Sequence, residues 1–125
     1  MLLVAYKNKA DQAAYARQHY QNNKEIYKRR AAVHRKAVRQ KIRIYIFETL
    51  KMHPCVDCGE SDPVVLDFDH RDRTAKRFNI ADAVSCGASL KSVVAEILKC
   101  DVRCANCHRR KTYVENNGKY KSLAP

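Results

Sequence analysis

The stretch Cys104-Ala105-Asn106-Cys107 decides how this chain folds, because it holds two cysteines at the spacing of a metal-binding knuckle. A second knuckle, Cys55-Val56-Asp57-Cys58, lies upstream, and 45 residues separate the two. Four thiolates supplied in this way form a tetrahedral zinc site that has no open coordination position. The sequence therefore predicts a structural zinc ion held by Cys55, Cys58, Cys104 and Cys107.

Other uses of the cysteines fit the pattern less well. One C-x-x-C alone is typical of a thioredoxin-like redox pair, but two in one chain favour a metal. Disulfides belong to secreted proteins, and we expect this chain to stay inside the cell. Cys86 and Cys100 are interpreted as reduced, buried thiols. Cys100 stays open as an alternative ligand, because it lies four residues before Cys104.

The residues between and after the knuckles predict a small α+β domain. The expected elements are a strand from Val64 to His70, a turn of helix over 80–84, a helix that begins after Ser89, a return strand over 101–103 and a final helix over 106–114. In the first strand, Leu66 and Phe68 are expected to face the core. Asp67 and Asp69 are expected on the other, solvated face, where Asp67 could also act as a supporting carboxylate.

The candidate catalytic side chains lie at the ends of these elements. Asp69 and His70 end the first strand, and His108 directly follows the last cysteine of the second knuckle. Neighbours on a helix are about 100° apart, so Cys107 can face zinc while His108 turns toward the strand. We expect Asp69, His70 and His108 to meet beside the basic run Arg109-Arg110-Lys111. A carboxylate, two imidazoles and phosphate-binding cations suit metal-assisted phosphodiester hydrolysis.

The N-terminal part of the chain is a basic helical extension. Residues 1–53 hold 13 of the 25 Lys and Arg but only 3 of the 13 Asp and Glu, and they contain no Gly or Pro. This composition favours helix, with one interruption at Asn22-Asn23. An apolar stripe at spacings of three and four is expected to dock on the following domain: Val38, Ile42, Tyr45, Ile46 and Leu50.

The excess of positive charge indicates a polyanionic partner. The formal net charge is +12, and phosphate neutralisation is the usual reason for such an excess. The candidate contacts to a nucleic acid are Lys28, Arg35, Arg39, Arg109, Arg110 and Lys111. For the extension, the alternative is a solvated helical face that binds nothing. For Arg109, Arg110 and Lys111, the alternative is that cations near the end of a helix suit its dipole.

No segment indicates a membrane. No apolar run approaches the roughly 18 residues needed to span a bilayer, and the opening Leu2-Leu3-Val4-Ala5 is too short for a signal peptide. We expect a cytoplasmic protein. The domain boundary is placed near Pro54, so that residues 54–125 form the zinc-stabilised domain and residues 116–125 a loose tail.

The joint motif resembles that of a known family. Leu66-Asp67-Phe68-Asp69-His70 followed by residues 104–112, with Cys55 and Cys58 upstream, is similar to the HNH endonucleases, and in particular to the small four-cysteine proteins of bacteria and phages. The resemblance covers about residues 53–115. It implies a ββα-metal fold in which His70 is the general base that activates water. Asp69 and His108 would ligate Mg²⁺ or Mn²⁺, and the products would carry 5′-phosphate and 3′-hydroxyl ends.

One position departs from the family pattern. The middle Asn lies about nine residues before the last His in that pattern, and Lys99 stands there in this chain. Asn106 is the nearest candidate for the role, and Asn79 is another. Asn106 has an equal alternative interpretation as the cap of the final helix.

The site residues, the basic charge and the resemblance together lead to a divalent-metal-dependent endonuclease of double-stranded DNA. The alternative is a zinc-stabilised nucleic-acid-binding module that does not cleave, in which Asp69, His70 and His108 are structural. RNA as the substrate stays open, because positive charge does not distinguish it from DNA. A homodimer, or a DNA-processing partner from the phage or host, is compatible with either function.

Overall fold

The computed structural model describes residues 8–118, and over this range the protein is α+β, with helices and one small sheet. The chain forms two compact units, Met1–Ala37 and Val38–Pro125, and each is described by itself. The α+β class agrees with the sequence prediction. Among residues 8–118, no helix is long and apolar enough to cross a membrane.

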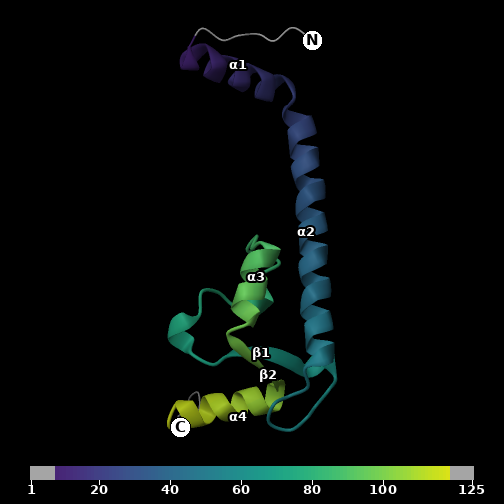
Figure 1. Ribbon diagram of the computed structural model, residues 1–125, viewed down its shortest axis with the longest axis vertical. Helices are drawn as coiled ribbons and strands as arrows, with labels where there is room; N and C mark the ends of the chain where they lie inside the picture. Colours follow the sequence, from purple (N-terminus) through teal and green to yellow (C-terminus); the bar gives the residue numbers. More distant parts are fainter. Residues whose placement is uncertain (1–7, 119–125) are drawn as a thin grey trace, which may run out of the picture. The chain divides into compact units, whose positions relative to one another are not determined.

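The first unit is helical, as predicted. Helix α1 spans Lys9–Asn22, and the side chain of Asn8 caps it by accepting from the Asp11 amide at 2.9 Å. Asn23 interrupts the helical path before α2, Lys24–Met52, which continues into the second unit. The predicted break at Asn22-Asn23 is confirmed, and Figure 1 shows the change of direction there.

The second half of α2 is part of the core of the second unit. Leu50 belongs to one cluster of buried residues, with Leu66, Val102 and three of the cysteines. Ile42, which is only 1% exposed, belongs to a second cluster with Ile80 and Val93. The predicted stripe is confirmed, because Val38, Tyr45 and Ile46 pack against these clusters too. For this reason the compact unit begins at Val38, before the boundary expected at Pro54.

The sheet consists of two antiparallel strands. β1 spans Leu66–His70 and β2 spans Cys100–Cys104, and the register pairs Leu66 with Cys104 and His70 with Cys100. The predicted strand therefore begins too early: Val64 and Val65 lie in a 3₁₀ turn, η1, Pro63–Val65. Asp62 causes this turn by accepting from the Val64 amide, with Pro63 at the first helical position.

Helices α3 and α4 lie on opposite sides of the two strands (Figure 1). α3, Leu90–Ile97, begins after Ser89, as the sequence predicts. The Ser89 side chain caps it by accepting from the Ser92 amide. α4, Ala105–Glu115, follows β2 without a loop. The segment from β1 to α3 carries two further 3₁₀ turns, η2, Arg73–Ala75, and η3, Ile80–Asp82. The two strands thus lie between α3 and α4 in space (Figure 1), although α3 lies between them in the sequence.

The end of α4 is close to the predicted stop. Asn116 is the C-cap, and the Gly118 amide donates to the Tyr113 carbonyl at 2.9 Å. Gly118 has a φ of +69°, a left-handed conformation that glycine adopts without steric cost. The rest of the expected loose tail and the opening Leu2–Ala5 stretch lie outside the described residues.

Candidate metal centre and active-site cleft

The two knuckles bring four cysteines into one cluster. The Sγ atoms of Cys55, Cys58, Cys104 and Cys107 all lie within 4.8 Å of one another. Cys58 Sγ and Cys104 Sγ are 3.7 Å apart. A tetrahedral zinc ion with bonds of about 2.3 Å needs sulfurs roughly 3.8 Å apart. The cluster could therefore hold a metal such as zinc, and the predicted convergence of these cysteines is confirmed.

Local backbone contacts shape both knuckles. In the first, the Gly59 amide donates to the Cys55 carbonyl at 2.9 Å, and Gly59 has a φ of +78°, which permits the tight turn. The Val56 amide donates to the Val102 carbonyl at 3.0 Å and so ties this knuckle to β2. In the second, the Cys107 amide donates to Cys104 Sγ at 3.4 Å at the start of α4.

The two remaining cysteines lie outside the cluster. Cys100 Sγ donates to the Glu96 carbonyl at 3.4 Å, so it does not replace a ligand in this arrangement. Its partial burial and the charge of Glu96 raise the pKa of the Cys100 thiol to about 11. Cys86 is exposed, and its Sγ donates to the Ala83 carbonyl. The prediction that both thiols are buried is therefore wrong for Cys86 and only partly right for Cys100.

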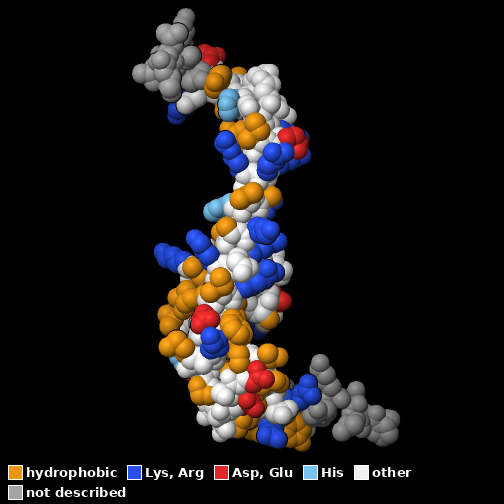
Figure 2. All heavy atoms as spheres, turned by 90° about the vertical axis from the view of Figure 1, so that its right-hand side faces the viewer, with side chains coloured by type: hydrophobic (Ala, Val, Ile, Leu, Met, Phe, Trp, Pro, Cys, Tyr) orange, Lys and Arg blue, Asp and Glu red, His pale blue; other side chains and the backbone are white. Residues whose placement is uncertain are grey.

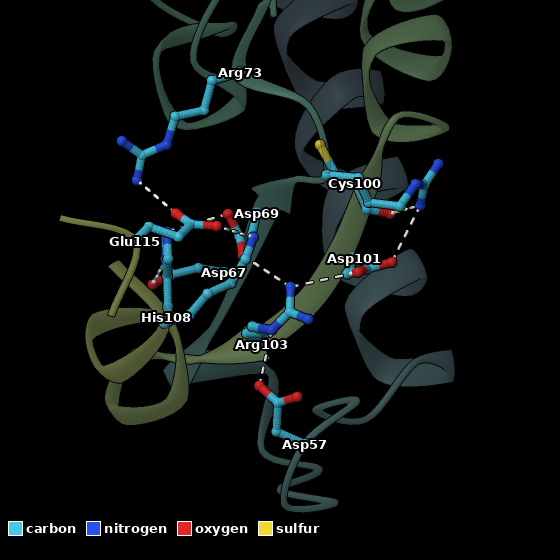
Figure 3. Close-up of polar contacts among 11 residues, drawn as sticks. Asp57, Asp67, Asp69, Arg73, Cys100, Asp101, Arg103, His108 and Glu115 are labelled. Atoms are coloured by element: carbon cyan, nitrogen blue, oxygen red, sulfur yellow. Dashed lines mark hydrogen bonds and ion pairs between the residues drawn. The ribbon is translucent and has the colours of Figure 1, made fainter. Parts of the chain in front are cut away.

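His108 lies between two carboxylates of β1 (Figure 3). Its Nε2 is 3.5 Å from Asp69 Oδ1, and its Nδ1 is 3.5 Å from Asp67 Oδ2. Asp67 and Asp69 share a face of β1 because alternate residues of a strand point the same way. The predicted meeting of Asp69 with His108 is observed. Asp67 is exposed, as predicted, and also contacts that histidine.

Asp69 is more enclosed than predicted, because two cations share its other oxygen. Lys111 Nζ donates to Asp69 Oδ2 at 2.7 Å, and an Arg103 guanidinium nitrogen donates to the same oxygen at 2.8 Å. Burial raises the pKa of Asp69, but the hydrogen bond from Lys111, the charges of His108 and Lys111, and the Arg103 contact together lower it. Asp69 is therefore ionised at neutral pH, with Oδ1 left to face His108.

His70 points to the other face of β1. Its Nε2 lies 2.8 Å from Glu96 Oε1 on α3, and the His70 side chain is only 7% exposed. Burial raises the pKa of Glu96, but hydrogen bonds from Lys99, from the Arg77 amide and from His70 outweigh it and lower that pKa to about 2. Sequence reasoning missed Glu96. From the sequence alone, a glutamate next to the apolar stripe of α3 looks the same whether its side chain is buried or exposed to solvent.

The candidate catalytic side chains border one cleft, which has a volume of about 680 Å³. Asp69, His70 and His108 all line it, together with Arg73, Lys76 and Asn79. The three residues that sequence reasoning assigned to catalysis thus border one space, although His70 and Asp69 leave opposite faces of β1. Arg73 is held at the cleft by an ion pair with Glu115, 3.0 Å away (Figure 3).

The two candidate asparagines are placed differently. Asn106 is exposed and is not among the residues that line the cleft. The interpretation of Asn106 as a helix cap is wrong, because Cys104 caps α4. Asn79 lines the cleft and donates to Asp82 Oδ2 at 3.0 Å. Lys99, at the position of the expected Asn, donates to Glu96 Oε2 at 2.8 Å.

The candidate phosphate contacts fall into two groups. Arg109 and Arg110 are exposed on α4, whereas Lys111 is turned toward Asp69. On α2, Lys28, Arg35 and Arg39 are exposed, and Lys28 forms an ion pair with Glu25 at 3.2 Å. Figure 2 shows lysine and arginine side chains gathered along α2 with few acidic ones beside them. These residues are therefore available to a polyanion, with Lys111 the exception.

Comparison with known proteins gives no relative: no family model, no curated protein and no solved structure matches the chain. The resemblance to HNH endonucleases therefore stays a prediction from the motif. The chemistry of the cleft and of the cysteine cluster is what supports a function.

Proposed function

We propose that this protein is an HNH-type DNA endonuclease with a ββα-metal domain, a structural zinc ion and a divalent cation at the cleft. The observation that carries the proposal is the convergence of Asp69, His70 and His108 on one cleft, in a domain whose four-cysteine cluster includes Cys107, the residue before His108. Arg73 and Lys76 at the same cleft supply positive charge for a phosphate. The order β1, β2 and α4 is the element order that the resemblance implies.

Asp69 and His108 are the residues that would hold the divalent cation, Mg²⁺ or Mn²⁺. They offer only two donors, and within residues 8–118 the four cysteines are the only larger group of converging ligands. Two donors fit this use, because Mg²⁺ binds through one or two side chains and completes its shell with water and substrate phosphate. When bound, the cation would neutralise charge on the scissile phosphate and on the departing 3′ oxygen.

The chain's own residues would perform the remaining steps. His70 would take a proton from the attacking water, since the lone pair of a neutral imidazole can accept one. Asp67 would orient His108 through the contact of its Oδ2 with Nδ1, 3.5 Å away. The basic residues of α2 and the exposed Arg109 and Arg110 would bind the DNA backbone.

A second candidate, a zinc-stabilised nucleic-acid-binding module that does not cleave, is favoured by a specific observation. Lys111 and Arg103 already neutralise Asp69, as they would in a purely structural network. In that case the basic surfaces would bind nucleic acid and the cleft would have no catalytic role.

One experiment separates the two functions. Supercoiled plasmid is incubated with the zinc-loaded protein and Mg²⁺ or Mn²⁺, and nicked circles are then treated with DNA ligase. The endonuclease predicts metal-dependent nicks that ligase reseals, because the ends carry 5′-phosphate and 3′-hydroxyl groups. Tight binding without nicks in either metal would support the binding module, and competition with RNA at equal salt would identify the preferred nucleic acid.

A further inference from the structure

Glu96 is a charged side chain that the domain buries completely, with 0% of the residue exposed. Burial of a carboxylate is costly unless donors surround its oxygens. The Arg77 amide donates to Oε1 at 2.8 Å, and Lys99 Nζ donates to Oε2 at 2.8 Å. His70 Nε2 completes the set at 2.8 Å from Oε1. Donors from β1, from the loop after it and from the turn between α3 and β2 thus converge on this carboxylate.

The ionised state of Glu96 determines which nitrogen of His70 carries the proton. These contacts hold the pKa of Glu96 at about 2, so the carboxylate is ionised and can only accept hydrogen bonds. His70 Nε2 must therefore be the N–H donor. In a neutral imidazole the other nitrogen, Nδ1, then carries the lone pair.

Nδ1 of His70 is accessible to solvent. The structure gives Nδ1 no hydrogen bond to any described residue, and no fully buried side-chain nitrogen or oxygen in residues 8–118 lacks a partner. Nδ1 is therefore not fully buried. His70 is also one of the residues that line the cleft.

We propose that Glu96 is a positioning residue: it holds the His70 imidazole as the Nε2–H tautomer, with the Nδ1 lone pair directed into the cleft. The inference rests on the proposed function, in which His70 accepts a proton from water. Lys99 supports the arrangement by balancing the charge of Glu96, and its Nζ also donates to the Ala75 carbonyl at 2.9 Å. This second contact ties the turn η2, which carries Arg73, to the same network.

Two double variants test this role without leaving an unpaired charge in the core. In Glu96→Gln/Lys99→Met, the glutamine keeps an acceptor for His70. In Glu96→Met/Lys99→Met, the acceptor is removed while side-chain volume is similar. We expect kcat for plasmid nicking to fall about 10- to 100-fold more in the Met/Met variant, with KM for DNA unchanged. Lys91→Met, at an exposed position of α3, is the control and is expected to behave as wild type.

Nitrogen NMR of His70 provides a readout that needs no nuclease activity. In its neutral form, the imidazole should be the Nε2–H tautomer in the wild type and a mixture of the two tautomers in the Met/Met variant. An Nδ1–H tautomer in the wild type would overturn the inference, as would equal kcat in the two double variants. If the wild type shows no nicking at all, the proposed function fails, and the tautomer alone still decides whether Glu96 positions His70.

Discussion

Lys111 Nζ lies 2.7 Å from Asp69 Oδ2, so a lysine of α4 neutralises the carboxylate that the candidate divalent-metal site would use. Arg103 contacts the same oxygen, while Oδ1 faces His108. The two oxygens of Asp69 thus have different surroundings, because Oδ2 contacts two cations and Oδ1 contacts His108. A cation that binds beside Oδ1 would be repelled by the nearby lysine.

Replacing Lys111 should therefore strengthen divalent-metal binding. We expect Lys111→Met to raise the affinity for Mn²⁺ up to about fivefold, the effect of roughly 1 kcal/mol from a partly exposed charge. Calorimetry on zinc-loaded protein measures this change. Arg110→Met, at an exposed position of the same helix, is the matched control. Weaker Mn²⁺ binding in Lys111→Met would mean that the lysine supports the site instead of opposing it.

Zinc should be required for the second unit to fold. A structural zinc site contributes roughly 10–16 kcal/mol of apparent binding energy, and the cysteines belong to the core around Leu50. We expect a strong chelator, or Cys58→Ser, to abolish cooperative thermal unfolding followed by circular dichroism. Cys86→Ser, outside the cluster, should retain one zinc per chain and the wild-type transition. Unchanged unfolding after chelation would show that the cluster does not depend on metal.

The packing of α2 can be tested with two isoleucines of the same helix. Ile42 is 1% exposed and Ile44 is 53% exposed. We expect Ile42→Ala to lower the free energy of unfolding by about 2–5 kcal/mol, because it leaves a cavity between α2 and the residues around Val93. Ile44→Ala should change it by no more than about 0.5 kcal/mol. Similar effects of the two changes in urea denaturation would contradict the docking of this helix.

The basic residues of α2 should contribute affinity for DNA and not the chemistry. We expect the combined change of Lys28, Arg35 and Arg39 to Gln to weaken binding. The log–log salt slope should become shallower by roughly 0.9 for each DNA phosphate that the variant no longer neutralises. Fluorescence anisotropy at several salt concentrations measures the slope, with Lys91→Gln as the control for removal of an exposed charge elsewhere. A slope equal to that of the wild type would exclude α2 from the DNA interface.

Much of the fold could be predicted because strong local signals agreed with the packing. The stripe from Val38 to Leu50 predicted how α2 docks, and the two knuckles predicted the four-cysteine cluster. The start of β1 was predicted too early. Val64 and Val65 favour a strand by propensity, but Pro63 and the side chain of Asp62 impose a 3₁₀ turn.

The contacts of the candidate site were less accessible to sequence reasoning. The pairing of Asp69 with His108 follows from strand and helix periodicity, so it could be predicted. The contacts of Lys99, Lys111 and Arg103 depend on which long side chain reaches which carboxylate across the domain, and no local pattern encodes that choice. Lys99 is the clearest case, since its departure from the family pattern could be seen but its contact with Glu96 could not.

The most direct test of the proposed nuclease is the rate of metal-dependent nicking by His70→Ala under single-turnover conditions. The variant is compared with wild type and with His34→Ala, an exposed histidine of α2, at equal zinc content. Loss of a general base predicts a fall of about 100-fold or more for His70→Ala, with DNA affinity retained and His34→Ala at the wild-type rate. Nicking by His70→Ala at the wild-type rate would contradict the role of His70 and of the cleft it lines.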